Sequence, residues 1–326
     1  MRVAASPEDF VVDEEPLYPA LGEGAHTFVR VEKRLRNTED VVRALARFAG
    51  VRPGDVGYAG RKDRVAITRQ WLSVPGLDPA HARDFAGDGF RVLEAVRHPH
   101  KLRTGQLRAN RFELVVRELA PEQVAGTAAG LEQLAARGMP NRFGPQRFGR
   151  DGRNAEAARA LLERGEAPRD RRAARFLLSA LQAEVFNACL AARPLALDAV
   201  ESGEVAWLHA SGASFVIEDV AAETARAARF ELSAAGPIFG TRLLPATGAP
   251  HRREETVLRA HGIPDTLRLP PGLRLRGARR PFRVRPEAAR CEAVGADAVR
   301  LVFTLPPGSY ASVLVDSLFA APEGQS

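Results

Sequence analysis

Four charged residues, Arg61, Lys62, Asp63 and Arg64, follow Gly60 in the stretch GYAGRKDRVAITRQW. A carboxylate among three cations is expected to have a lowered pKa and to stay ionised. An ionised carboxylate can act as a nucleophile or as a base, and the cations beside it can hold a phosphate backbone. Asp63 is therefore the candidate catalytic residue, and the alternative is a charged hairpin tip without a role.

Motifs for other kinds of catalysis are incomplete in this sequence. GYAGRK lacks the GxxxxGK(S/T) spacing of a phosphate-binding loop. GEGAHT ends in threonine where a third glycine is needed, which counts against Rossmann-type binding of a nucleotide or S-adenosylmethionine. His98 and His100 have no third ligand nearby, and Cys189 and Cys291 are too far apart for a cysteine-based zinc site. These motifs therefore give no support to a nucleotide cofactor of the Rossmann type or to a cysteine-based zinc site.

The charge of the chain favours a polyanionic partner. Its 326 residues carry a formal net charge of +7, which suits nucleic acid or an anionic membrane surface. Of the 47 basic residues only Lys33, Lys62 and Lys101 are lysines, a ratio that a GC-rich genome would also produce. The clusters Arg169–Arg172 and Arg279–Arg280 can contact phosphates or simply form a solvated face. No apolar run reaches the roughly 18 residues of a membrane span and no signal peptide opens the chain, so we expect a cytoplasmic protein.

The first third of the chain alternates strands with one clear helix, and these elements must position Asp63. The helix covers residues 38–50, with Asn37 or Thr38 as its cap and an apolar face that includes Leu45. Alternating patterns predict strands over 9–14, 26–33, 56–60, 66–74, 90–98 and 111–119, and a second helix over 121–137. Asp63 then lies at the polar tip between two strands.

The rest of the chain is first helical and then returns to strands. Helices are predicted over 155–164, 174–192, 221–230 and 309–319, and strands over 281–287, 290–294 and 298–305. The late strands have few other partners, so we expect them to join the N-terminal sheet. This order predicts a discontinuous catalytic domain of residues 1–137 and 281–326, interrupted by an inserted domain of residues 138–280.

Several segments resemble the TruD family of tRNA pseudouridine synthases, in the same order along the chain. They are PEDFVVDEE, GYAGRKDRVAITRQW, HKLRTGQLRANRFELVVR, GMPNRFGPQRFGRDGRN, GPIFGTR and LPPGSYASVLVDSL. The resemblance covers both ends and much of the middle. It implies isomerisation of uridine to pseudouridine in tRNA, typically at position 13, without cofactor or metal. In the KD pair of the signature, Asp63 matches the nucleophile.

The resemblance also implies a pocket for the target base. Phe112 would stack on the uracil, Asn110 would hydrogen-bond near the aspartate or the base, and Phe10 matches another aromatic residue of the family's site. Lys62 and Arg64 would contact the RNA backbone or tune Asp63. Taken alone, the two phenylalanines are typical core residues. The chain departs from the family at Ala4, where relatives often carry a lysine close to the active site.

The implied fold is α+β. It comprises a mixed, mainly antiparallel sheet with flanking helices, interrupted by a helix-rich α/β insertion (the TRUD domain), with a cleft between the two. The implied partner is tRNA, with no membrane and no protein partner, and we expect a monomer. Asp63 could form a covalent adduct or act through a glycal intermediate. The rival functions are an RNA-folding chaperone without chemistry and an RNA methyltransferase.

Overall fold

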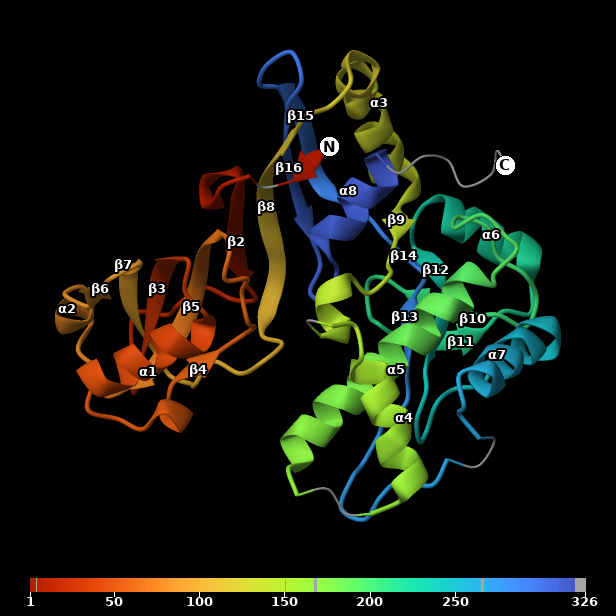
Figure 1. The fold of residues 1–326 in the computed structure, drawn as a ribbon, viewed down its shortest axis with the longest axis horizontal. Coiled ribbons are helices and arrows are strands. Elements are labelled where there is room, and N and C mark those ends of the chain that lie inside the picture. The colour runs from red at the N-terminus through yellow and green to blue at the C-terminus, as the bar shows by residue number, and fades with distance from the viewer. Residues whose placement is uncertain (4, 150, 167–168, 265–266, 320–326) are drawn as a thin grey trace. The chain divides into compact units, whose positions relative to one another are not determined.

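The structure is a computed structural model that describes residues 1–3, 5–149, 151–166, 169–264 and 267–319. The chain forms two compact units (Figure 1). The first contains residues 1–132 and 286–307, and the second contains residues 133–285 and the described residues from 308 onward. Ala4, at which the chain departs from the family pattern, lies outside the described residues.

A ten-stranded sheet is the framework of the first unit. Its order is β15-β16-β8-β2-β5-β3-β7-β6, with β1 paired to β8 and β4 paired to β5. Among the described strands of this sheet only the β2–β5 pair is parallel, so the predicted mixed and mainly antiparallel sheet is confirmed. The strands are β1 (Arg2–Val3), β2 (Phe10–Pro16), β3 (His26–Arg34), β4 (Gly57–Tyr58), β5 (Ile67–Pro75), β6 (Ala86–Gly87), β7 (Phe90–His98), β8 (Leu107–Arg117), β15 (Glu287–Ala293) and β16 (Val299–Leu305).

Helix α1 (Thr38–Phe48) covers part of this sheet. Asn37 is its N-cap, and the Asp40 carboxylate accepts a hydrogen bond from the Asn37 main-chain nitrogen. The apolar face of the helix packs on β3 and β5 in one cluster, which includes Val41, Val42, Leu45, Ala46, Val29, Val31, Leu72 and Val74. The cap therefore leaves the side chain of Thr38, the first helical residue, free to face the sheet. The other helices that begin in this unit are α2 (Pro79–Ala82) and α3 (Pro121–Arg137), and short 3-10 turns span Pro7–Asp9 and Pro53–Asp55.

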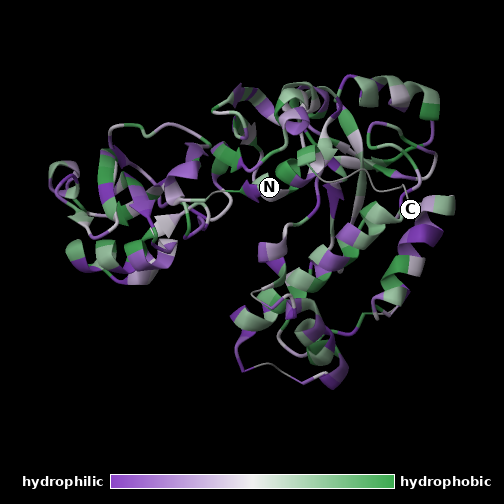
Figure 2. Cartoon of the chain, turned by 45° about the horizontal axis from the view of Figure 1, so that its top comes forward, coloured by the Kyte–Doolittle hydropathy of each residue, from purple (hydrophilic) through white to green (hydrophobic). Residues whose placement is uncertain are grey.

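The second unit has its own core around the long helix α5 (Arg171–Ala191). Leu178, Leu181 and Phe186 of this helix are fully buried. Figure 2 shows hydrophilic and hydrophobic residues mixed along the helices, as expected for helices that bury one side. The other described helices of this unit are α4 (Asn154–Arg164), α6 (Val220–Ala228), α7 (Gly248–Ala260) and α8 (Ala311–Phe319), and a 3-10 turn spans Pro145–Phe148. The unit also contains a four-stranded antiparallel sheet of order β11-β10-β12-β13. Its strands are β10 (Val205–Leu208), β11 (Ser214–Val216), β12 (Leu232–Ile238) and β13 (Ala278–Pro281), and β9 (Met139–Pro140) pairs separately with β14 (Arg283–Val284).

One expectation about the C-terminal segments needs correction. Strands β15 and β16 do join the N-terminal sheet, but β13 pairs with β12 and β14 pairs with β9 in the second unit. Helix α8 also belongs to the second unit, where it contacts β9. The compact units thus have other bounds than the predicted domains.

Strands β9 to β12 of the second unit were not predicted from the sequence. The segment LSAAGPI forms β12, in which every residue but the last is buried. A strand that is buried on both faces shows no alternation, and alanine, glycine and proline have low strand propensity. Neither residue alternation nor strand propensity therefore indicated a strand at this segment.

Two of the arginines that could contact phosphates have structural roles instead. Arg279 is buried and pairs with the carboxylate of Glu254 at 2.5 Å. Arg280 lies over the ring of Phe143 and donates hydrogen bonds to the main-chain oxygen of Asn141, and burial lowers its pKa to about 10. Neither of the two alternatives, phosphate contact or a solvated face, fits the buried Arg279, whereas both stay open for the Arg169–Arg172 cluster, whose residues are exposed.

Candidate active site

Asp63 lies in a loop that runs back along β5. The short strand β4 pairs with Leu72 and Ser73, near the far end of β5. Residues 59–66 must therefore return along β5 before they reach its first residue, Ile67. The predicted strand arms exist only in part, and Asp63 lies in this returning loop, which we call the Asp63 loop, rather than at a hairpin tip.

Polar side chains tie the Asp63 loop to the sheet and to the start of α1. The main-chain nitrogen of Lys62 donates to Thr38 Oγ1 at 3.0 Å. The Thr38 hydroxyl donates to Gln70 Oε1 at 2.9 Å, and Gln70 Nε2 donates to the main-chain oxygen of Gly60 at 3.4 Å. Thr38 and Gln70 are both buried, so the hydrogen bond between them is shielded from water and holds both side chains in position to bind the loop.

Strand register brings the predicted pocket residues to one face of the sheet. Residues directly opposite each other on paired strands point to the same face, as do residues two apart on one strand. Glu14 of β2 lies opposite Asn110 of β8, and Phe303 of β16 lies opposite Phe112. The residues that share this face are Phe10, Val12, Glu14, Lys33, Thr68, Gln70, Asn110, Phe112 and Phe303.

Three aromatic rings form a row on this face. The rings of Phe10 and Phe112 lie 6.3 Å apart and nearly parallel, and those of Phe112 and Phe303 lie 5.4 Å apart. Phe112 is buried, whereas Phe10 is half-buried. Among the described residues, the buried Asn110 Oδ1 atom has no hydrogen-bond partner. Phe10 is thus the only ring of this row that is partly exposed, and the predicted contacts of Phe112 and Asn110 with the base stay predictions.

The cations beside Asp63 in sequence are directed toward other carboxylates. The Lys62 ammonium forms an ion pair with the Glu14 carboxylate, and their side chains are only 6% and 1% exposed. Arg61 pairs with Glu39 at 2.5 Å, and Arg64 is exposed. Lys62 therefore anchors the loop, and its predicted contact with RNA stays a prediction, as does that of Arg64.

The expected lowering of the Asp63 pKa is wrong. Asp63 is exposed as a whole residue, but desolvation by the surrounding protein raises the pKa of its carboxyl above 3.8. Lys33 and Lys62 oppose this shift and do not cancel it. The sequence pattern predicted a lowered pKa because three cations neighbour Asp63 along the chain. Two of them, Arg61 and Lys62, pair with other carboxylates, and the desolvation of Asp63 is not visible in the sequence.

This shift predicts the acidic limb of the reaction's pH profile. A nucleophile or base must be ionised, so the rate should rise with pH through the pKa of Asp63 and level off above it. Because that pKa is raised, the midpoint should lie above 3.8. Single-turnover rates of pseudouridine formation between about pH 4 and pH 7 would measure it. A midpoint at or below 3.8 would contradict the prediction.

Two residues of this site were missed in the sequence. Lys33 lies on the same face and donates a hydrogen bond to the main chain of Asp63. Phe303 completes the aromatic row, although it is distant in sequence. Phe303 carries no signal beyond strand alternation, whereas the rarity of lysine in this chain could have singled out Lys33.

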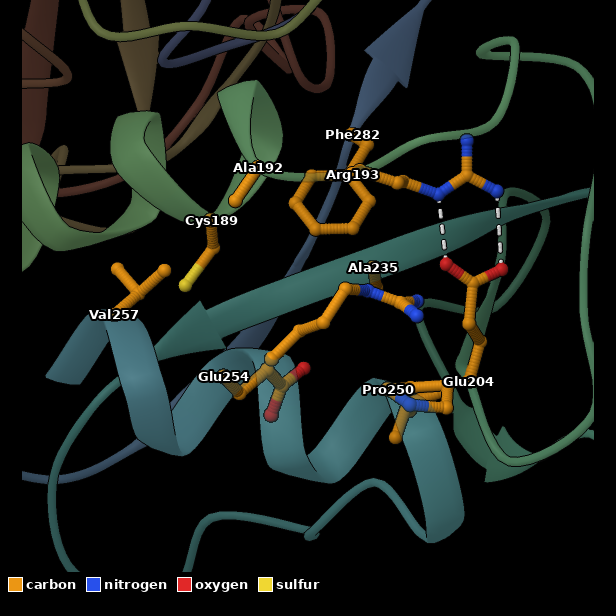
Figure 3. Close-up of a pocket in the computed structure, with 11 residues that line it drawn as sticks. Cys189, Ala192, Arg193, Glu204, Ala235, Pro250, Glu254, Val257 and Phe282 are labelled. Carbon is orange, nitrogen blue, oxygen red and sulfur yellow. Dashed lines mark hydrogen bonds and ion pairs between the residues drawn. The ribbon is translucent and has the colours of Figure 1, made fainter.

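A cavity in the second unit is too small to hold a substrate. It lies between α5, α7 and β12, and its volume is about 20 Å³ (Figure 3), which is enough for one water molecule. The Arg193 guanidinium and the Glu204 carboxylate lie beside it and form a buried two-bonded pair with distances of 2.7 and 3.0 Å (Figure 3). No group of three or more His, Cys, Asp or Glu residues in the described ranges could hold a metal ion. The lack of a cofactor stays a prediction.

The part of the chain that the structure describes has no helix long and apolar enough to cross a membrane.

Comparisons with known proteins agree along nearly the whole chain. The profile of the family tRNA pseudouridine synthase D (TruD) matches residues 1–167 and 169–317. The protein named tRNA pseudouridine synthase D of Anaeromyxobacter sp. (strain Fw109-5) is 47% identical, with 97% of this chain and 91% of that protein covered. The protein of the same name from Thermus thermophilus is 39% identical over 96% of this chain and 87% of that protein.

A solved structure has the same fold. The crystal structure described as tRNA pseudouridine synthase D (TruD) from Methanosarcina mazei superimposes with a TM-score of 0.77. It covers 98% of this chain and 93% of its own, at 20% identity, which supports the fold alone. The family profile and the two relatives confirm the resemblance seen in the sequence, and the chain belongs to the tRNA pseudouridine synthase D (TruD) family.

Proposed function

We propose that this chain isomerises uridine to pseudouridine at position 13 of tRNA, with Asp63 as the nucleophile. The activity follows from membership of the tRNA pseudouridine synthase D family, whose profile matches both ends and the middle of the chain. The observation that supports the site is the placement of the Asp63 loop, which is tied to the sheet face that carries Asn110 and Phe112.

The reaction is an isomerisation and needs no further reactant. The bond between uracil N1 and the ribose C1′ breaks, a bond between C5 and C1′ forms, and the proton lost at C5 balances the one gained at N1. The target nucleotide must leave the stack before a side chain can reach it. Phe112 and Phe10 would stack on the free base while it turns, and Asn110 would hold its polar edge.

Asp63 has two possible roles in this scheme. As a nucleophile its carboxylate attacks C1′ and displaces uracil, so that an ester holds the ribose until the base has turned. As a base it removes a ribose proton, and a glycal carries the ribose instead. Both roles need the ionised carboxylate, and both are consistent with the raised pKa of Asp63.

We propose tRNA as the partner and a cytoplasmic monomer as the working form. The net charge of +7 favours a polyanion. The exposed cluster of Arg169, Arg171 and Arg172 on the second unit offers guanidinium groups for phosphate contacts. Arg64 would serve in the same way beside Asp63.

The target position can be tested with two tRNA transcripts that differ at one nucleotide. The purified protein should convert U13 to pseudouridine in the first, and should leave the transcript with C13 unchanged. The measurement is nucleotide-resolved mapping of modified residues, first with no S-adenosylmethionine or metal added and then in a parallel reaction with S-adenosylmethionine.

The other outcomes point to other conclusions. Product at another uridine would refute position 13 and keep the activity. Tight binding with no product would favour the RNA-folding chaperone, and a methylated product that requires S-adenosylmethionine would favour the methyltransferase.

A further inference from the structure

Lys33 reaches the backbone of the Asp63 loop from inside the protein. It lies near the end of β3 and is 1% exposed. Its ammonium donates a hydrogen bond to the main-chain oxygen of Asp63 at 2.6 Å and a longer one to that of Lys62 at 3.4 Å. Charged donors form stronger hydrogen bonds than neutral ones, so this contact fixes the backbone at the catalytic residue itself.

Charged groups of both signs surround the Lys33 ammonium. The loop contributes Asp63 and Lys62, and the start of α1 contributes Glu39 and Asp40. Thr68 of β5 and Phe90 of β7 lie opposite Lys33 on the neighbouring strands and carry no charge. Burial lowers the pKa of Lys33 to about 8, because the desolvation outweighs the attraction of the three carboxylates.

The composition of the chain gives an independent reason to single out Lys33. Arginine supplies all but three of the 47 basic residues, yet two of the three lysines anchor the Asp63 loop. A guanidinium group is wider, planar and always charged, whereas an ammonium group is compact and can lose its proton. Lysine at these positions is therefore consistent with a small space that an arginine would overfill.

We propose that Lys33 is the positioning residue of the catalytic loop and the basic neighbour of Asp63. Its ammonium holds the main-chain oxygens of Asp63 and Lys62, which fixes the Asp63 carboxyl in place, and its charge favours the carboxylate form. This role rests on the proposed function of Asp63.

Removal of the Lys33 ammonium should slow the reaction without weakening binding. Lys33→Met keeps the length of the side chain and loses the donor, so the loop can shift. A misplacement of about 1 Å near the chemistry can cost about 100-fold in rate, and we expect kcat to fall by about that factor with the affinity for tRNA kept. The matched control is Lys101→Met, because Lys101 also donates to a main-chain oxygen, that of Gly54, but at the surface.

The pH profile separates positioning by charge from simple packing. In the wild type, kcat/KM for the U13 transcript should fall as pH rises through about 8, where Lys33 loses its proton. Lys33→Arg keeps a charge that does not titrate, so this alkaline limb should be absent while the rate stays below that of the wild type. Uracil also ionises in alkaline solution, but it does so equally with both proteins, so the difference between the wild type and Lys33→Arg isolates the part of the limb that belongs to Lys33.

A direct readout of the coupling needs no RNA. Lysine labelled with carbon-13 at Cε gives one signal for each of the three lysines, and each is assigned by replacing that lysine. The Lys33 signal should titrate near pH 8 and move to lower pH in Asp63→Asn, because the carboxylate no longer stabilises the ammonium. The Lys101 signal should not move.

These measurements distinguish the possible failures. An unchanged kcat in Lys33→Met, or a loss of tRNA binding as large as the loss of rate, overturns the proposal. If Lys33→Met does not fold, Lys33→Arg decides, and an alkaline limb in that variant with the same midpoint as in the wild type overturns the proposal. A Lys33 signal that titrates at the same pH in the wild type and in Asp63→Asn also overturns the proposal. This result stands even if the wild type makes no pseudouridine, because the measurement needs no RNA. A wild type that makes no pseudouridine would instead refute the proposed function.

Discussion

Asp63→Asn is expected to abolish pseudouridine formation while tRNA binding is kept. An amide of the same shape cannot attack C1′ or remove a ribose proton, whichever role Asp63 has. Loss of a residue that makes and breaks bonds typically costs on the order of 10⁴-fold or more in kcat. Single-turnover assays with the U13 transcript measure the rate, and filter binding at fixed salt measures the affinity.

Loss of folding should not explain the result. Desolvation makes the Asp63 carboxyl harder to ionise, so a neutral amide at that position carries no extra cost of burial. Asp84→Asn is the matched control, because Asp84 lies in the same unit with a side chain that is 77% exposed. Normal product from Asp63→Asn, or equal losses in both variants, would contradict the assignment.

Glu14→Gln is expected to destabilise the first unit and to disorder the Asp63 loop. The Glu14 carboxylate pairs with buried Lys62 and also accepts a hydrogen bond from the main-chain nitrogen of Trp71 at 3.1 Å. Glutamine can keep the second contact but leaves the ammonium unpaired. Breaking a buried ion pair from one side costs about 3–5 kcal/mol, so we expect a loss of that size in the free energy of unfolding, with slower catalysis.

The two tryptophans allow the first unit to be measured separately. Trp71 lies in the first unit and Trp207 in the second, so in a Trp207→Phe background the fluorescence follows only the first unit during unfolding in urea. Glu15→Gln is the control, because the neighbouring Glu15 pairs with Arg108 at the surface, where a pair contributes about 0–1 kcal/mol. Equal losses from the two variants would show that the Glu14–Lys62 pair is not special.

A double replacement tests which part of the effect is catalytic. Glu14→Gln with Lys62→Met leaves no ammonium unpaired, and glutamine keeps the hydrogen bond from the Trp71 main-chain nitrogen. Stability should therefore recover, but the rate should stay low because the loop has lost an anchor. A variant that recovered both would show that the pair serves only the fold.

The local elements were largely readable from the sequence. The pattern around Val41, Val42 and Leu45 predicts α1 and its cap, and the alternation in HTFVRVEK predicts β3, because these elements bury one side only. Strand β12 could not be predicted from the sequence, since all of its residues but the last are buried and most of them are small. The unit to which α8 belongs could not be predicted from the sequence either, because a helix packs on whichever unit offers a matching surface.

The sequence by itself determined the family, the α+β class and the identity of the candidate acid, since motifs and residue patterns are local properties of the chain. Only the tertiary structure decided what surrounds Asp63. Its pKa is raised rather than lowered because desolvation and the pairing of Lys62 with Glu14 depend on residues far apart in sequence. The same holds for Lys33, which strand register brings under the loop from β3. Burial and charge pairing are properties of the folded chain, and no spacing along the sequence encodes them.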